Sequence, residues 1–239
     1  CNFIFMKYIE LLILSLLISS TAICSQNKDD FYTYKKGDEN GIGKWFMGRE
    51  IAYVMGYQGI EWLERSSREK EENTSKLIKN MRIKSTDIIA DIGAGSGYHA
   101  FKMASLNSKG KVYTVDIQAE MLYAIQQNKL YKKYNNIELI LGDEQTTNLP
   151  KNTFDKILMV DVYHEFSYPK EMLISIKNAL KENGELFLIE YRLEDESIPI
   201  KKVHKMSENQ AVKELKSVGL KFKKNIKNLP IQHCMIFTK

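Results

Sequence analysis

The segment from Asp91 to Tyr98 combines an acidic residue with three glycines at alternating positions, Asp-Ile-Gly-Ala-Gly-Ser-Gly-Tyr. It lies between an apolar run that predicts a strand and a segment that predicts a helix, which is the context of a nucleotide-binding turn. Glycines permit a tight turn and the close approach of a ligand where a Cβ would collide. A dinucleotide fingerprint would have its third glycine at Tyr98, and the Asp91 carboxylate would repel a pyrophosphate. The pattern therefore favours a ligand with a cationic moiety, such as S-adenosylmethionine (SAM).

A second acidic residue, Asp116, ends the next predicted strand, roughly 20 residues after the last loop glycine. From this position a carboxylate can accept hydrogen bonds from ribose hydroxyls, and Ile117 beside it could pack on adenine. A solvated strand end is the alternative interpretation. The spacing within the glycine loop, Asp91 to Tyr98, resembles motif I of class I SAM-dependent methyltransferases. The cofactor-binding residues expected in the loop are Asp91, Gly93, Ala94, Gly95 and Gly97.

This resemblance implies a further cofactor contact after the third predicted strand. Class I methyltransferases place an acidic side chain there, near the adenine amino group, and Asp143 of the Gly142-Asp143 pair occupies that position. Because Gly-Asp is also an ordinary turn sequence, a purely structural role for Asp143 is the alternative.

A dense polar and aromatic cluster, Asp161 to Phe166, follows the fourth predicted strand, at the edge where a transferable methyl group should lie. It resembles the corresponding motif of small-molecule methyltransferases, among them the ubiquinone and menaquinone biosynthesis group. His164 is a candidate general base or acceptor-orienting group, because imidazole titrates near neutral pH; the alternative is a histidine that only packs. Asp161 and Glu165 are further candidates for the catalytic role, and Tyr163 is a candidate acceptor contact.

The stretch after the fifth predicted strand could build the acceptor pocket. Glu190-Tyr191-Arg192 ends that strand, and Leu193 to Met206 leads to the next helix. In class I enzymes such insertions often line the acceptor site, so Tyr191, Arg192 and His204 are candidate substrate-binding residues. No metal ligands are expected among these positions.

The chain from Gly48 to its end is similar to a group of bacterial SAM-dependent methyltransferases with exported-looking N-termini. Tyr57 departs from the group, in which we expect a histidine, so no role is assigned there. The resemblance rests on the glycine loop together with Gly48-Arg49-Glu50, Trp62-Leu63-Glu64-Arg65, Asp161 to Phe166, Glu190-Tyr191-Arg192 and His204-Lys205-Met206.

The alternation of apolar runs and helix-period segments predicts an α/β fold with a parallel sheet. We expect the Rossmann-like class I methyltransferase fold, a seven-stranded, mostly parallel sheet whose last strand is antiparallel, with helices on both faces. Pro169 and Gly184 bound one expected helix, and Ser207 and Gly219 bound another. Strands are expected at 87–91, 111–116, 137–141, 154–160, 185–190, 221–225 and 231–238.

The N-terminal residues differ in character from the rest. A lysine, Lys7, precedes the short apolar run Leu11 to Ile18, and small residues follow up to Cys24, which predicts a signal peptide or membrane anchor over 1–25. Residues 26–72 are expected to form an extension or lid, and 73–239 the SAM-dependent domain. The protein is thus expected to be exported, either periplasmic or membrane-anchored. Because SAM is made in the cytosol, a cytosol-facing anchor is the alternative.

Composition limits the choice of partners. The 239 residues carry a modest net charge of +5. The lysines of 201–239 alternate with apolar residues, as on a solvated face, so a nucleic-acid partner is not expected. The sequence predicts a SAM-dependent methyltransferase acting on an unidentified, small-molecule acceptor, with membrane association only through the N-terminal segment. The alternatives are an exported SAM- or ligand-binding protein without turnover, and another SAM-type transferase.

Overall fold

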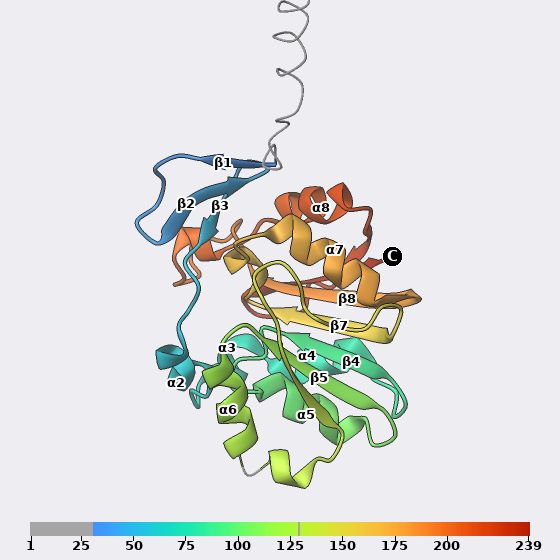
Figure 1. The fold of residues 1–239 in the computed structure, drawn as a ribbon. Helices are drawn as coiled ribbons and strands as arrows, with labels where there is room; N and C mark the ends of the chain where they lie inside the picture. Colours follow the sequence, from blue (N-terminus) through green and yellow to red (C-terminus); the bar gives the residue numbers. More distant parts are fainter. Residues whose placement is uncertain (1–30, 129) are drawn as a thin grey trace, which may run out of the picture. The chain divides into compact units, whose positions relative to one another are not determined.

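The computed structural model describes residues 31–128 and 130–239 (Figure 1). The chain divides into two units, Cys1–Thr33 and Tyr34–Lys239, and the short strand β1 (Tyr32–Tyr34) spans the division. The predicted signal peptide or anchor lies outside the described residues. Within the described part, no helix is long and apolar enough to cross a membrane. The following description concerns the second unit.

A seven-stranded sheet forms the centre of this unit (Figure 1). β4 to β8 run parallel, whereas β10 pairs antiparallel with both β8 and β9, which confirms the predicted fold. Across the sheet, the strands are β6 (Ile137–Leu141), β5 (Lys111–Asp116), β4 (Ile88–Ile92), β7 (Phe154–Val160), β8 (Leu180–Tyr191), β10 (Gln232–Thr238) and β9 (Lys221–Asn225).

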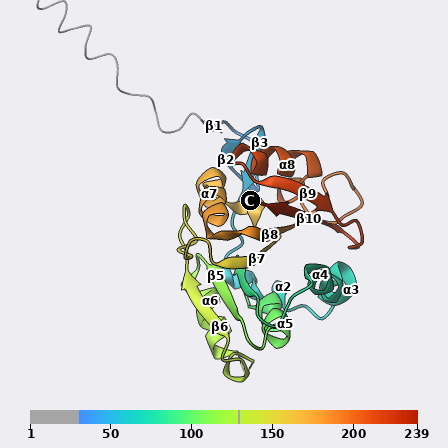
Figure 2. The same ribbon diagram turned by 90° about the vertical axis from the view of Figure 1, so that its right-hand side faces the viewer.

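Helices cover both faces of the sheet (Figure 2). Alternate residues of the central strands face opposite sides: Ile157 and Met159 of β7 join the core under α7 and α8, and Leu158 joins the core under α4 and α5. The helices are α4 (Thr74–Met81), α5 (Tyr98–Leu106), α6 (Ala119–Gln127), α7 (Pro169–Ala179) and α8 (Glu208–Ser217).

The boundaries of two predicted elements differ in the structure. The helix expected to end at Asn183-Gly184 ends at Ala179, because Leu180 already pairs with Phe154 as the start of β8. The strand expected at 185–190 is correspondingly longer and spans Leu180–Tyr191. Asn73 separates α3 (Arg68–Glu72) from α4: its left-handed backbone (φ 55°) ends α3, and its side chain accepts from the Lys76 N–H at the start of α4.

The segment before α4 contains a hairpin that the sequence pattern did not reveal. Its strands, β2 and β3, pair antiparallel, and the partly buried Arg49 forms an ion pair of 2.8 Å with buried Glu214 on α8. This pair fixes the hairpin to the main domain. The elements are β2 (Gly41–Phe46), β3 (Arg49–Ala52), the 3₁₀ turn η1 (Tyr57–Gly59), α2 (Ile60–Leu63) and α3 (Arg68–Glu72); further 3₁₀ turns are η2 (Tyr131–Lys133), η3 (Tyr163–Glu165) and η4 (Lys202–His204).

Candidate active site

A cavity of about 410 Å³ opens at the carboxyl ends of the parallel strands. It lies where the strand order reverses: β5 flanks β4 on one side and β7 flanks it on the other, which is where α/β sheets bind ligands. Its walls come from the glycine loop, the ends of β5 and β7, the segment before α4, and the segment after β8. The predicted site residues that line it are Gly93, Gly95, Asp116, Ile117, Asp143, Asp161, His164, Glu165, Tyr191 and His204.

The glycine loop forms the tight turn that its sequence predicts. Gly93, Gly95 and Gly97 all have positive φ, at 70°, 54° and 81°. A Cβ on Gly93 would lie 2.4 Å from the Val162 side chain, and one on Gly95 would lie 2.5 Å from Leu63. Both positions therefore require glycine, and both face the cavity. Gly97 instead precedes the first residue of α5 and shapes the turn.

Asp116 connects the end of β5 to the glycine loop. One carboxylate oxygen accepts from the Gly95 N–H and the other from the Gln118 N–H, each at 2.9 Å. A carboxylate can accept about four hydrogen bonds, so capacity remains for ribose hydroxyls in the cavity. Burial raises the pKa of Asp116. The neighbouring Ile117 is 43% exposed at the cavity wall, an apolar surface suited to an adenine ring.

Asp143 has the turn-forming role that was the alternative for this residue, and it also faces the cavity. Its Oδ1 accepts from the backbone N–H groups of Gln145 and Thr146, both at 2.7 Å. Since Asp143 also lines the cavity, the turn holds the carboxyl group at the end where Ile117 lies. Adenine recognition by Asp143 stays a prediction.

Asp91 is buried behind the cavity wall. Burial raises the pKa of this carboxyl to about 7, and the positive charge of Arg68 acts in the opposite direction. Its Oδ2 has no hydrogen-bond partner among the described residues. A buried carboxyl group with one unpartnered oxygen next to a glycine cradle is the arrangement expected if a cationic ligand completes the electrostatics. This observation supports the fit of SAM to the site.

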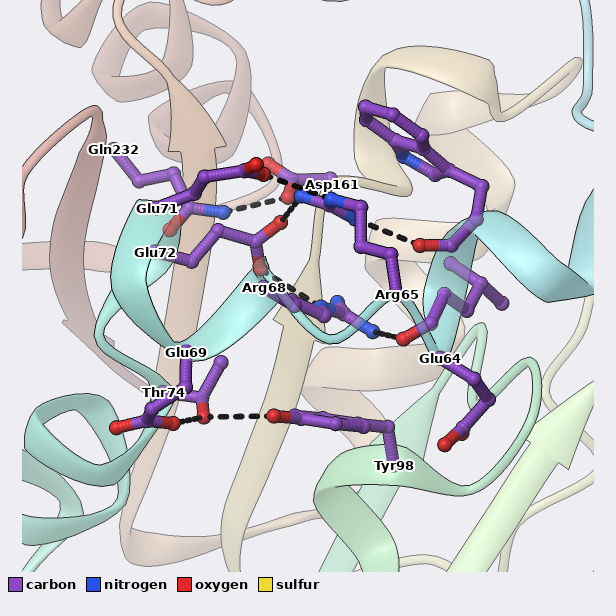
Figure 3. A network of polar contacts seen from close by, with 12 residues as sticks. Glu64, Arg65, Arg68, Glu69, Glu71, Glu72, Thr74, Tyr98, Asp161 and Gln232 are labelled. Carbon is purple, nitrogen blue, oxygen red and sulfur yellow. Dashed lines mark hydrogen bonds and ion pairs between the residues drawn. The ribbon is translucent and has the colours of Figure 1, made fainter.

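A network of ion pairs and hydrogen bonds orders the segment Trp62 to Glu72, which lines part of the cavity (Figure 3). Buried Glu72 accepts from Arg68 at 2.9 Å and from Arg65 at 2.6 Å. Arg68 also donates to the Leu63 carbonyl, and Arg65 lies 3.8 Å from the Trp62 ring centroid in a cation–π contact. Arg68 and Glu72 were not among the predicted site residues, although their i, i+4 spacing could have indicated an ion pair on one helix.

The same network reaches the predicted acceptor side of the cavity. Tyr191 donates from its hydroxyl to Glu72 at 3.2 Å. Asp161 has an unusual left-handed backbone (φ 50°) and accepts from Gln232 at 2.6 Å (Figure 3). Its Oδ1 has no partner within the described residues. Burial, with the nearby charges of Glu72 and Glu190, raises the pKa of Asp161 well above its usual value.

His164 lies in a chain of polar contacts at the acceptor side. Its Nδ1 is 2.6 Å from Glu190, and its Nε2 is 3.2 Å from Nδ1 of His204. Although burial lowers the pKa of His164, the charges of Glu190 and Glu165 raise it to about 10. Burial and the positive charge of His164 lower the pKa of His204. Contacts with Glu190 and His204 thus fix the orientation of the His164 ring. The sequence had left open whether His164 is a general base, an acceptor-orienting group or a residue that only packs.

Three predicted positions have other surroundings. Tyr163 is fully buried and donates from its hydroxyl to Glu214 at 2.6 Å, so it does not face the acceptor. Arg192 lies outside the cavity and donates to the carbonyl oxygens of Leu229 and Gln232, which holds the loop between β9 and β10. Ala94 lies in the glycine turn, where its backbone N–H donates to Val115, and is not part of the cavity wall.

This fold, with its glycine loop and Asp116, is that of a SAM-binding α/β domain. A family model described as a methyltransferase domain matches residues 83–232, and the chain belongs to this family. The match identifies the domain as a member of the methyltransferase family, and the buried Asp91 carboxyl group beside the glycine loop fits SAM as the ligand of the site. A SAM-dependent methyltransferase from Aquifex aeolicus shows the same fold, with a TM-score of 0.72 at 24% identity over 77% of this chain and 98% of that one.

Among curated relatives, the chain is 34% identical over 101 residues to the tRNA U34 carboxymethyltransferase of Pseudoalteromonas atlantica, a match that covers 42% of this chain and 30% of that protein. It is 30% identical over 106 residues to the ubiquinone/menaquinone biosynthesis C-methyltransferase UbiE of Wigglesworthia glossinidia brevipalpis, which covers 43% of this chain and 42% of that protein. The chain thus spans less than half the length of these relatives.

Proposed function

We propose that this methyltransferase acts on a small molecule whose acceptor atom lies beside His164, Glu165 and His204. The observation that carries the proposal is the shape of the acceptor side, where these three side chains line one cavity together with the cofactor loop. Pro199 and Ile200, from the segment after β8, border the same cavity. A partly apolar pocket with a few convergent polar groups is typical of small-molecule sites.

Different residues of the chain would bind the cofactor and position the acceptor. The glycine loop, Asp91 and Asp116 would hold SAM, which supplies an electrophilic methyl group on a sulfonium. His164, fixed by Glu190, would position the acceptor, and Asp161, whose Oδ1 has no partner among the described residues, would offer a polar contact at the cavity wall. Positioning of the acceptor and exclusion of water can provide much of the acceleration in such a displacement.

The segment Trp62 to Glu72 would act as the cover of the bound cofactor. Leu63 packs against Gly95, and Trp62, Arg65 and Arg68 line the cavity. These contacts support the prediction that the residues before the domain form a lid rather than only a cover for the sheet.

The acceptor class can be tested with SAM labelled in its methyl group. The purified protein is incubated separately with a metabolite filtrate, total RNA and denatured protein, and labelled products are measured. We expect label in the filtrate, and less label with Asp116→Ala at a SAM concentration near the wild-type Kd. Label in RNA alone, as the name of one relative would suggest, would contradict the proposal. SAM binding without label in any fraction would favour a binding protein without turnover.

The location of the enzyme is a separate proposal, which rests on the sequence of residues 1–25 alone. We propose that this segment directs export or anchors the chain at a membrane. Cell fractionation with N-terminal sequencing of the mature protein tests it; an uncleaved chain in the soluble cytosolic fraction would contradict it.

A further inference from the structure

Three potential metal ligands meet at the acceptor side of the cavity. Nε2 of His164 is 3.2 Å from Nδ1 of His204, and Oε1 of Glu165 is 3.7 Å from each of these nitrogens. The two turns η3 and η4 bring these side chains together, and all three line the cavity. At 3.7 Å, Glu165 is within ion-pair distance of both imidazoles but beyond the length of an ordinary hydrogen bond.

The three distances match the edges of a small coordination polyhedron. Tetrahedral zinc sites have metal–nitrogen and metal–oxygen bonds of about 2.0–2.2 Å, which places their ligand atoms about 3.3–3.6 Å apart. Octahedral coordination with the same bonds would need about 2.8–3.1 Å. The observed 3.2, 3.7 and 3.7 Å are closer to the tetrahedral set. Two imidazoles also favour a transition metal over magnesium or calcium.

The surroundings of His164 supply the support that metal-binding histidines usually have. Its other ring nitrogen, Nδ1, is 2.6 Å from Oε2 of Glu190. The second oxygen of Glu190 accepts from the backbone N–H groups of Tyr163 and His164, at 3.0 and 3.3 Å. A carboxylate fixed in this way holds the imidazole with Nε2 directed at the cluster, as in carboxylate–histidine–zinc arrangements.

We propose that His164, Glu165 and His204 bind a divalent transition-metal ion of the zinc class, with one coordination position open to the cavity. The sequence did not predict this site, because its two histidines are separated by 40 positions. Zinc binding does not depend on the proposed function, because it can be measured without SAM or acceptor. If the proposed function also holds, the open position is where an acceptor oxygen would bind, and the ion would lower the pKa of an acceptor hydroxyl.

The test is a zinc titration of the untagged full chain after dialysis against a chelator, in competition with a chromophoric zinc indicator. Cys1→Ser and Cys24→Ser are included in every protein so that thiols outside the described residues add no zinc site. We expect one zinc ion per chain. Cobalt(II) should give the intense visible absorption of four- or five-coordinate cobalt.

Variants show whether the ion occupies this cluster. His204→Gln and Glu165→Gln, at partly exposed positions, should each weaken zinc binding by more than about 100-fold, and Glu190→Gln by about 10–100-fold with one ion still bound at saturation. His233→Gln is the matched control. His233 also contacts a carboxylate, Glu194, at 3.0 Å, but no second histidine lies beside it among the described residues. The His233→Gln protein should therefore bind zinc with wild-type affinity.

Near-UV circular dichroism and thermal unfolding confirm that each variant is folded. The proposal is overturned if the wild-type chain binds no zinc in the micromolar range. It is equally overturned if folded His204→Gln and Glu165→Gln retain wild-type affinity, or if cobalt gives only the weak spectrum of a six-coordinate ion. In those cases the contact between His164 and His204 is a hydrogen bond that needs no metal.

Discussion

At the scale of single residues, two carboxyl groups beside the glycine loop have different surroundings and should act differently on SAM. Asp116 reaches the cavity and has both oxygens ordered by backbone N–H groups. Asp91 is buried behind it without a partner for Oδ2 among the described residues. Asp116 is therefore suited to hydrogen bonding with a ligand, whereas Asp91 is suited to long-range electrostatic attraction of a ligand.

Asp116→Ala should weaken SAM binding by about 1–3 kcal/mol, because it removes charge-assisted hydrogen bonds to the ribose. Isothermal titration calorimetry measures the change. Asp155→Ala, which removes a carboxyl group at the opposite end of the sheet, is the control and should retain the affinity. Unchanged SAM affinity in folded Asp116→Ala would remove this residue from the cofactor site.

Asp91 predicts proton release when SAM binds. The pKa of Asp91 is about 7 in the free protein, so the group is mostly protonated at pH 6. A bound cation favours the carboxylate and lowers that pKa, so binding should release protons at pH 6 and few above pH 8. Calorimetry in two buffers of different ionisation enthalpy measures the release. Asp91→Asn should abolish it, whereas equal release by that variant would assign the proton elsewhere.

The same group predicts a stability effect. Because the folded-state pKa lies above the unfolded value of 3.8, the unfolded state loses its proton first as pH rises. The contribution of Asp91 to stability is thus complete below about pH 4 and is lost as pH rises toward 7. Asp91→Asn should therefore gain stability relative to wild type at pH 8 but not at pH 4, in denaturant unfolding. A constant difference at both pH values would contradict this.

At the scale of elements, α3 contains a buried ion pair between Arg68 and Glu72, two residues that line the cavity. Arg68→Ala would leave Glu72 with an uncompensated charge, and breaking such a pair costs about 3–5 kcal/mol. Arg65, which also contacts Glu72, should reduce the loss toward the lower value. Urea unfolding measures this loss of folding stability. The exposed neighbour Lys70 is the control, since Lys70→Ala should change stability by less than about 0.5 kcal/mol; equal effects of the two substitutions would exclude a role for the pair.

The contact between α2 and the glycine loop can be tested by a double substitution. Gly95→Ala places a Cβ 2.5 Å from the Leu63 side chain at a position with φ 54°, so both stability and SAM affinity should fall. Leu63→Ala removes the steric overlap but not the backbone strain. The pair Gly95→Ala and Leu63→Ala should therefore show less than the summed loss of stability. Strict additivity in urea unfolding would show that the two residues do not meet.

At the scale of the whole molecule, the cavity is assembled from segments before, within and after the parallel strands. Binding of SAM should consequently protect distant parts of the sequence together. Hydrogen exchange should slow in the glycine loop and in 62–72, whereas β9, at the far edge of the sheet, should be unchanged. Protection confined to the glycine loop would contradict a lid role for the earlier segment.

The sequence by itself determined the sheet, the cofactor loop and Asp116. These depend on local rules: apolar strands of fixed length, glycines where φ is positive, and a strand–helix–strand unit that sets the distance from the loop to the next strand end. It was also sufficient to predict the antiparallel strands at the end of the sheet, because Leu229 and Pro230 interrupt two β-rich runs.

Only the tertiary structure decided which polar residues of the acceptor side meet. His164 and His204 lie 40 positions apart, and Tyr191 and Glu72 lie 119 apart. Their contacts depend on how η3, η4, α3 and the end of β8 pack, which no local pattern encodes. The same packing directs Tyr163 toward Glu214 and Arg192 toward backbone carbonyls. Local spacing thus fixes a cofactor loop made of one chain segment, whereas a site built from side chains of distant segments exists only once the sheet and its covering elements have come together.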